Sequence, residues 1–232
     1  MPSTSRKGAS RAAGWFTRLF GKLRPVKSGT VAPAATVPPP APSISREALA
    51  ALPLGRYEGP VVMVESAPQL AQARAELLAA RVVGFDTETR PAFRKGEHYA
   101  PCLLQFAGER TVYLFRLEGT AAHALLREVL ESPRIVKAGV SVADDLRELK
   151  AVFAFDEKNV IDLGTIARRH GLAQTGVRNL AGLLLGFRIV KGSKTSNWAA
   201  PVLTPAQIAY AATDAWVSRE LCVDFERRGW LA

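Results

Sequence analysis

The sequence is poor in side chains that form disulfides or bind soft metal ions. Its 232 residues include two cysteines and three histidines, and neither Cys102 nor Cys222 stands at a metal-ligand spacing. We therefore expect no zinc site and no disulfide, as in a reduced cytoplasmic protein. No run of about 18 apolar residues occurs, so the sequence predicts no integral membrane span.

Acidic residues are missing from the first 45 positions, which hold seven of the 31 basic residues. The remainder carries 24 basic and 21 acidic residues, so the net charge of +10 belongs mainly to the N-terminal segment. Residues 24–45 are rich in Pro, Ala, Ser and Thr, a composition typical of an extended linker. We expect residues 1–45 to form a disordered basic tail and residues 46–232 to form one domain.

Within this tail, residues 11–24 place apolar side chains at helical spacing opposite basic ones. A basic amphipathic helix of this kind would dock on anionic lipid, nucleic acid or a partner protein. The same composition also fits a disordered basic terminus or an organelle transit peptide. The sequence leaves these interpretations open.

From residue 46 onward, hydrophobic periodicity predicts a single α/β domain with a mixed sheet flanked by helices. Ser66 and Thr204 each begin a capping box with a proline just inside a helix. Residues 108–110 should link two strands in a hairpin, and Gly186 should end a helix. The expected strands are 82–88, 102–107, 111–115, 135–138 and 160–163, and the expected helices are 66–78, 121–130, 142–153, 164–170, 177–185 and 204–228.

Two acidic side chains end the strand expected at residues 82–88. Asp86 and Glu88 are two residues apart, so they share one face of the strand. Like charges at this distance raise each other's pKa unless a cation neutralises them. Oxygen ligands on a rigid strand suit Mg²⁺ or Mn²⁺ better than zinc, so the pair predicts a metal site.

Three further polar side chains come from two predicted helices. Tyr210 and Asp214 lie at i and i+4 of the last helix and share one face, and Asp145 lies near the start of an earlier helix. Carboxylates from a strand end and two helices can meet at one edge of an open α/β sheet, where such sheets bind ligands. Four carboxylates suit two ions about 4 Å apart that assist hydrolysis of a phosphodiester. The Tyr210 hydroxyl would orient the attacking water, because its ordinary pKa of about 10 makes it a poor base.

The motifs FDTET, GVSVADD and YAATD, in this order, resemble the three exonuclease motifs of the DEDD superfamily in its tyrosine-containing branch. Within the branch, FDTETRPAFRKG and KTSNWAAPVLTPAQIAYAATDAW are most similar to the Werner-type exonuclease domain, and ribonuclease D is slightly more distant. The resemblance covers roughly residues 60–228. It implies a ribonuclease H-like fold and removal of nucleotides from 3′ ends with two Mg²⁺ or Mn²⁺ ions. The metal ligands that it implies are Asp86, Glu88, Asp145 and Asp214, with Tyr210 as the residue that positions the water.

Three acids near the second motif need separate interpretations. Asp144 and Asp145 are adjacent, and one of them should face the site. The motif spacing that begins at Gly139 favours Asp145, which leaves Asp144 as a first-turn acid that favours the helix dipole. Asp162 follows an apolar pair, and we interpret it as the N-cap of the next helix rather than as a ligand.

Two loops rich in basic and polar residues flank the motifs. The loop before the last helix would contact phosphates and stack a terminal base, or it is a solvated loop with Trp198 buried in the core. The loop after Glu88 forms either a phosphate-binding rim or an exposed basic surface. The expected substrate-binding residues are Arg94, Lys95, Lys191, Lys194, Asn197 and Trp198.

The sequence therefore predicts a divalent-metal-dependent 3′-5′ exonuclease that acts on nucleic acid ends, with Werner-type DNA processing favoured. Ribonuclease D-like trimming of RNA is the alternative enzyme, because short motifs do not reveal contacts to the 2′-hydroxyl. An inactive nucleic-acid-binding module is the alternative from another class, and the presence of all five expected catalytic residues weighs against it. No P-loop of the form GxxxxGK[ST] occurs, so unwinding would need a partner.

Overall fold

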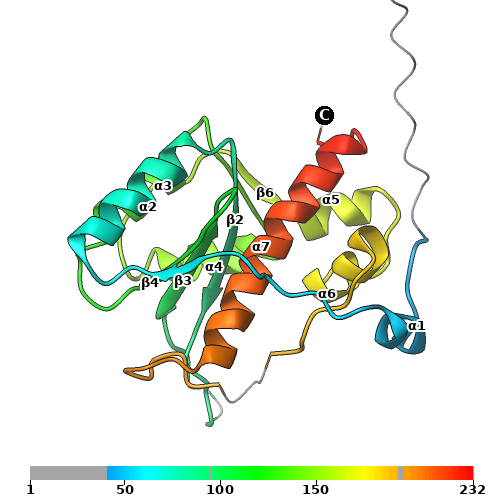
Figure 1. The fold of residues 1–232 in the computed structure, drawn as a ribbon, viewed down its shortest axis with the longest axis horizontal. Helices are drawn as coiled ribbons and strands as arrows, with labels where there is room; N and C mark the ends of the chain where they lie inside the picture. The colour runs from blue at the N-terminus through cyan, green and yellow to red at the C-terminus, as the bar shows by residue number, and fades with distance from the viewer. Residues whose placement is uncertain (1–40, 95, 193–195, 232) are drawn as a thin grey trace, which may run out of the picture. The chain divides into compact units, whose positions relative to one another are not determined.

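A six-stranded mixed sheet lies at the centre of the protein, whose computed structural model describes residues 41–94, 96–192 and 196–231 (Figure 1). The strands are β1 Val61–Met63, β2 Val82–Glu88, β3 Leu103–Ala107, β4 Val112–Arg116, β5 Val136–Gly139 and β6 Val160–Asp162. Their order is β1-β4-β3-β2-β5-β6. The β2-β3 and β3-β4 pairs are antiparallel, and the β1-β4, β2-β5 and β5-β6 pairs are parallel. The predicted hairpin joins β3 to β4, whereas the three-residue strand β1 was too short to be predicted from periodicity.

Helices cover both faces of this sheet. They are α1 Arg46–Ala51, α2 Ala67–Ala79, α3 His123–Glu131, α4 Val142–Leu149, α5 Leu163–Arg169, α6 Val177–Leu180, the π-helical turn η1 Ala181–Leu185 and α7 Pro205–Arg227. Apolar side chains of α2, α3 and α4 pack on one face with Val83 and Phe85 of β2. The long helix α7 crosses the other face (Figure 1), where it packs with Val82 and with apolar residues of β3 and β4. The mixed sheet flanked by helices that the sequence predicts is confirmed.

Strand β2 approaches the backbone of α7 unusually closely. Val83 and Phe85 enter the core beneath α2, α3 and α4, so the alternate positions of β2 face α7. A Cβ atom on Gly84 would lie 1.8 Å from the carbonyl oxygen of Ala215. Glycine is therefore required where the strand touches the helix, and this contact holds Asp86, at the end of β2, against α7.

The ends of α7 and η1 follow their sequence signals. The Thr204 hydroxyl accepts a hydrogen bond from the Gln207 N–H, and the Gln207 side chain accepts one from the Thr204 N–H. The predicted capping box of α7 is therefore complete. Gly186 follows η1 with φ at 75°, the left-handed conformation expected of a glycine at a helix end.

Two predicted helices differ in detail from the structure. In α2, the Ser66 hydroxyl accepts from the Gln69 N–H as expected, but the Gln69 side chain accepts from the N–H of Glu65. The reciprocal capping bond is thus shifted by one residue. Helix α4 ends at Leu149, before the predicted end at residue 153, and the chain then tightens into a turn in which the N–H groups of Ala151 and Val152 donate to the carbonyls of Glu148 and Leu149, three residues back. This turn directs the Phe153 ring into the core.

The segment before α1 lies against the domain. The Pro42 carbonyl accepts from the Ala173 N–H at 2.8 Å, and the Ile44 N–H donates to the Gln174 side chain at 3.0 Å. Ser45 caps α1. The domain start expected at residue 46 therefore falls inside a segment that already contacts the domain. Positions 1–40 of the expected tail lie outside the described residues.

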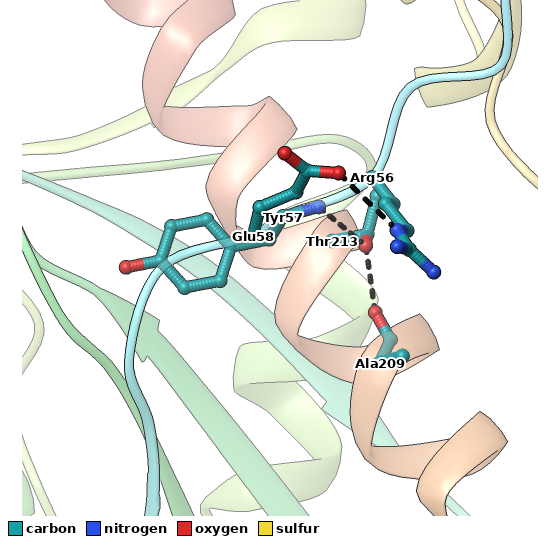
Figure 2. Close-up of polar contacts among 5 residues, drawn as sticks. All are labelled: Arg56, Tyr57, Glu58, Ala209 and Thr213. Atoms are coloured by element: carbon teal, nitrogen blue, oxygen red, sulfur yellow. Dashed lines mark hydrogen bonds and ion pairs between the residues drawn. The ribbon is translucent and has the colours of Figure 1, made fainter.

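The stretch between α1 and β1 crosses α7 one residue before Asp214. The Tyr57 N–H donates to the Thr213 hydroxyl at 3.1 Å, and that hydroxyl donates to the Ala209 carbonyl at 2.6 Å. Figure 2 shows how these residues lie. These two bonds tie a segment distant in sequence to the α7 turn that carries the third motif.

None of the helices in the described part of the chain is long and apolar enough to cross a membrane.

Gly84→Ala should destabilise the protein, because the added methyl group would meet the backbone of α7, which cannot rotate away as a side chain can. Overpacking of this kind typically costs about 1–3 kcal/mol, which corresponds to a fall in Tm of roughly 2–12 °C for a chain of this size. Differential scanning calorimetry would measure the difference.

Gly176→Ala is the matched control, because an added Cβ there meets no described atom within 4 Å beyond its chain neighbours. Its Tm should change much less. An equal fall in both variants would contradict the close contact between β2 and α7.

Candidate active site

Three carboxyl groups and a phenol line one cavity where β2 meets α7. The cavity has a volume of about 260 Å³, and its lining includes Asp86, Glu88, Tyr210 and Asp214. Strand alternation directs the first two toward α7, and the spacing of one helical turn places the last two on one face of α7. The fold thus brings together four of the five side chains that the sequence analysis selects as catalytic.

Asp214 is the most deeply buried of these acids, with 6% of its surface exposed. Its Oδ1 atom is buried and has no hydrogen-bond partner among the described residues. A buried carboxylate oxygen without a partner is costly, and a cation or a water molecule would offset that cost. Asp214 therefore offers an oxygen atom to a further ligand.

The fifth selected residue, Asp145, approaches from α4 on the opposite side of β2. Its Oδ1 accepts a hydrogen bond from the Thr87 hydroxyl at 2.7 Å. Its neighbour Asp144 is exposed and pairs with Arg147 at 2.5 Å. Of the two adjacent acids, Asp145 is thus the one that faces β2. It is not among the residues that line the 260 Å³ cavity, but its charge acts on both acids of β2.

The start of α4 is held by Asp162, which is the N-cap of α5. Its Oδ1 accepts from the Thr165 N–H at 2.8 Å, and its Oδ2 accepts from the Val142 N–H at 3.2 Å. The interpretation of Asp162 as an N-cap is confirmed, and the same carboxylate also caps α4. Ser141, the residue before α4, makes no side-chain cap and has φ at 62°. Asp162 therefore orients the helix that carries Asp145.

Burial raises the pKa of all four carboxyl groups. At Asp86 and Glu88, the charges of neighbouring carboxylates add to this effect. The pKa of Glu88 is raised to about 8, and those of Asp145 and Asp214 are each raised to about 6. The pKa of Asp86 is raised well above its ordinary value. Protons therefore occupy part of this cluster near neutral pH, and a divalent cation would displace them.

Two side chains that the sequence analysis did not identify limit these shifts. The hydrogen bond from Thr87 lowers the pKa of Asp145, and the positive charge of Arg178 lowers that of Asp214. Arg178 belongs to α6, and its Nε donates to the Ile189 carbonyl at 3.5 Å. Thr87 lies between Asp86 and Glu88 in the FDTET motif, but only the packing of α4 on β2 reveals its hydrogen bond to Asp145. Arg178 stands at no spacing that indicates a site, and only the packing of α6 reveals its effect on Asp214.

Tyr210 is packed on two sides. Its ring centroid lies 6.0 Å from that of Trp198. The backbone at Gly192 comes so close that a Cβ there would meet the phenol at 2.6 Å. Burial and the nearby Asp214 raise the pKa of Tyr210, so the hydroxyl keeps its proton near neutral pH and is suited to orienting a water molecule rather than to acting as a base.

The donor set fits a hard divalent cation. The carboxylates offer oxygen atoms only, and no histidine or cysteine is among the described residues that line the cavity. Mg²⁺ and Mn²⁺ prefer such ligands. Across the described ranges, no three acidic, histidine or cysteine side chains already stand together as a ligand set. The free Oδ1 of Asp214 and the raised pKa values of the carboxyl groups favour binding of a cation.

Three of the predicted substrate-binding residues border a second cleft, of about 410 Å³, which shares Tyr210 with the first cavity. Lys191 and Asn197 are exposed at its edge. Trp198 is only 5% exposed and packs with apolar residues of β3, β4 and α7. Trp198 is thus a core residue, which is one of the two alternatives that the sequence leaves open for this loop, and it also lines the cleft.

The basic loop after Glu88 borders a third cleft, of about 600 Å³. Arg90 lines this cleft, and its guanidinium lies 3.5 Å from the ring centroid of Tyr99, which also lines it. The predicted Arg94 is exposed, is not part of this lining, and its backbone N–H donates to Glu97. Arg90 is therefore the arginine of this loop that lies at the site. The predicted residues Lys95 and Lys194 lie outside the described part of the chain.

Comparisons with known proteins show which family this chain resembles. The model of a family described as 3′-5′ exonuclease matches residues 61–230. The bifunctional 3′-5′ exonuclease/ATP-dependent helicase WRN of Mus musculus is 31% identical over 141 residues, which cover 58% of this chain and 10% of that protein. Ribonuclease D of Gluconacetobacter diazotrophicus is 31% identical over 157 residues, which cover 66% of this chain and 39% of that protein.

A solved structure shares the fold. Ribonuclease D of Trypanosoma brucei, in complex with RNA U12, superposes with a TM-score of 0.64 at 17% identity, over 72% of this chain and 62% of that one. The expected ribonuclease H-like fold is confirmed. The chain spans only 10% and 39% of the two curated relatives, so it corresponds to one part of each. Because the family model covers most of the chain, this protein belongs to the 3′-5′ exonuclease family.

Proposed function

We propose that this protein removes nucleotides from the 3′ ends of nucleic acid by metal-dependent hydrolysis of the terminal phosphodiester. The observation that carries the proposal is the cavity where Asp86, Glu88, Tyr210 and Asp214 meet. Carboxyl groups whose pKa values are raised by burial and repulsion do not stabilise a fold at neutral pH, and they are typical of functional sites. Membership of the exonuclease family supports the same function.

Each of these residues would have a distinct role. Asp86, Glu88, Asp145 and Asp214 would hold two Mg²⁺ or Mn²⁺ ions, which when bound supply a reactive water and stabilise charge on the phosphate oxygens. The Tyr210 hydroxyl would orient the attacking water by a hydrogen bond. Its raised pKa suits this role, because the phenol keeps its proton.

Two clefts that each share a lining residue with the catalytic cavity support binding of a strand end. The 600 Å³ cleft shares Glu88 with the cavity, and the 410 Å³ cleft shares Tyr210. Arg90 stacked on Tyr99 lies in the first cleft, and Lys191 lies at the second. Cationic and aromatic side chains of this kind bind the phosphates and bases of single strands. We place the terminal nucleotides in these two clefts.

DNA is the substrate that we favour, on the likeness of the FDTETRPAFRKG segment to Werner-type domains. RNA is the second candidate, because ribonuclease D matches this chain at the same identity as WRN. We further propose a reducing, cytoplasmic location, since Cys102 and Cys222 are both free and both are buried or half-buried. The basic tail would add affinity for nucleic acid or for another anionic surface.

Digestion of matched DNA and RNA, labelled at either end, tests the proposed function. In Mg²⁺ or Mn²⁺, the 3′ label should be released first, and EDTA should stop its release. Faster cleavage of DNA would support the Werner-type assignment, and faster cleavage of RNA would support ribonuclease D-like trimming. Tight binding without cleavage under every condition would instead identify an inactive binding module.

Asp86→Asn should abolish cleavage while the metal-free protein keeps or raises its Tm, because one like charge leaves the cluster. The wild-type carboxyl groups bind protons more tightly in the folded than in the unfolded state. The stability that they contribute is therefore complete below about pH 4 and is lost as the pH rises toward about 8. Thermal melts in EDTA across this range should show a shallower decline for Asp86→Asn.

The exposed neighbour of Asp145 provides the control for activity. Asp144→Asn should leave turnover close to that of the wild type, because Asp144 faces solvent in its ion pair with Arg147. If Asp86→Asn lowered Tm sharply in EDTA, the cluster would be structural and the catalytic assignment would be wrong.

Tyr210→Phe removes the hydroxyl and keeps the ring, so it separates water positioning from packing. Turnover should fall by about 10²-fold or more, the usual contribution of a positioned proton-handling group, and KM should change little. Tyr57→Phe is the matched control, because the Tyr57 hydroxyl donates to the Arg110 carbonyl, outside the cavity lining. Steady-state kinetics that show normal turnover for Tyr210→Phe would reduce Tyr210 to a packing residue.

Deletion of residues 1–40 tests the tail, and it spares the docked segment at Pro42 and Ile44. All seven basic residues of the tail are removed, so affinity for duplex DNA at low salt should fall. The salt dependence of binding should become shallower by about 0.9 log units for each phosphate that the tail no longer neutralises. Turnover at saturating substrate should not change.

Binding at two salt concentrations and co-sedimentation with anionic liposomes, for the full-length and truncated forms, would measure these effects. Loss of liposome binding alone would assign the tail to a membrane surface rather than to nucleic acid. No difference in either assay would refute both roles.

A further inference from the structure

Gln105 of β3 lies directly opposite Asp86 of β2 in the antiparallel register. Opposed residues of neighbouring strands direct their side chains to the same face, with Cβ atoms about 4.5–5.5 Å apart. Both side chains therefore face the α7 layer of the protein. An uncharged amide thus stands beside a carboxyl group of the catalytic cavity.

The Gln105 side chain is wholly buried and unpaired. Its exposed fraction is 0%, and neither its Nε2 nor its Oε1 has a hydrogen-bond partner among the described residues. Its neighbours on the same face are apolar, including Leu103, Ala107 and Leu114. A buried amide without hydrogen-bond partners lowers the stability of the folded protein relative to an apolar side chain of the same shape. Packing alone therefore does not explain glutamine at this position.

A further unpaired atom lies in the same layer, on α7. Oδ1 of Asp214 is also buried without a partner, and Asp214 exerts the strongest charge effect on Asp86. Asp86 thus has an unpaired amide beside it on the sheet and an unpaired carboxylate oxygen near it on α7. In this arrangement the Gln105 amide is placed to orient the Asp86 carboxylate. The remaining oxygen lone pairs of Asp86 and the Oδ1 atom of Asp214 are then free to face a cation.

We propose that Gln105 is a positioning residue, whose Nε2 donates a hydrogen bond to the ionised Asp86 and directs that carboxylate toward a bound divalent cation. The inference rests on the proposed function. Glutamine suits the task because its amide adds no charge. A lysine or arginine at the same place would neutralise Asp86 and compete with the cation. Partners that orient metal ligands in this way typically contribute about 10–100-fold to metal affinity.

Gln105→Met tests the proposal, because it replaces the amide with an unbranched apolar chain of similar size. Mn²⁺ affinity, measured by isothermal titration calorimetry without nucleic acid, should fall by about 10–100-fold. The Tm in EDTA should hold or rise, because an unpaired buried amide is removed. A residue needed only for packing would show the opposite pattern, with a lower Tm and unchanged Mn²⁺ affinity. Gln105→Leu provides a second apolar replacement if the methionine variant does not fold.

Lys137→Met is the matched control. Lys137 on β5 is also fully buried, but its Nζ donates to the carbonyls of Ser132 and Ile135 at 2.7 and 2.9 Å. It pairs with Val83, so it faces the layer opposite the cavity. This variant should lower Tm and leave Mn²⁺ affinity unchanged.

Mn²⁺ binding and cleavage by the wild-type protein distinguish failure of the proposed function from failure of the role proposed for Gln105. If it bound no Mn²⁺ and cleaved no substrate, the proposed function would fail. If it bound Mn²⁺ and cleaved, while Gln105→Met bound Mn²⁺ equally tightly, the role of Gln105 alone would be refuted.

Discussion

Repulsion among four partly buried carboxyl groups is the interaction on which the site depends. Desolvation raises the pKa of all four, and the charges of neighbouring carboxylates in the cluster add to the effect at Asp86 and at Glu88, whose pKa reaches about 8. Arg178 offsets the repulsion in part, through Asp214. At neutral pH, such a cluster either retains protons or binds a cation. The surrounding fold must therefore hold in place groups that repel one another. A bound divalent ion would neutralise their negative charges.

The scaffold supplies that restraint through contacts between distant segments. Gly84 lets β2 touch the backbone of α7, and the Thr204 capping box sets where α7 begins. The hydrogen bonds of Thr213 join α7 to the segment that precedes β1. Asp162 caps both α4 and α5. Each contact restrains a backbone that carries a site residue, so the carboxylates do not relax apart.

Some polar groups around the carboxylates have hydrogen-bond partners, and others have none among the described residues. Thr87 already donates to Asp145, whereas Gln105 and Oδ1 of Asp214 have no partner among the described residues. A protein built only for stability would replace an unpaired buried amide with an apolar side chain. This pattern is typical of functional sites, where some stability is sacrificed for the ability to bind a ligand.

The sequence by itself determined which segments form strands and helices with a regular apolar pattern, and it determined the N-terminal capping box of α7. It also determined that the residue pairs on β2 and on α7 each share one face. Those features depend on neighbours along the chain, and local geometry is enough to predict them. Tertiary structure alone decided that Trp198 is buried in the core, that Arg90 rather than Arg94 borders a cleft, and that Gln105 stands beside Asp86. These properties arise from strand register and from packing between distant segments. No local pattern records them, because the energy of such contacts depends on residues far away in the sequence.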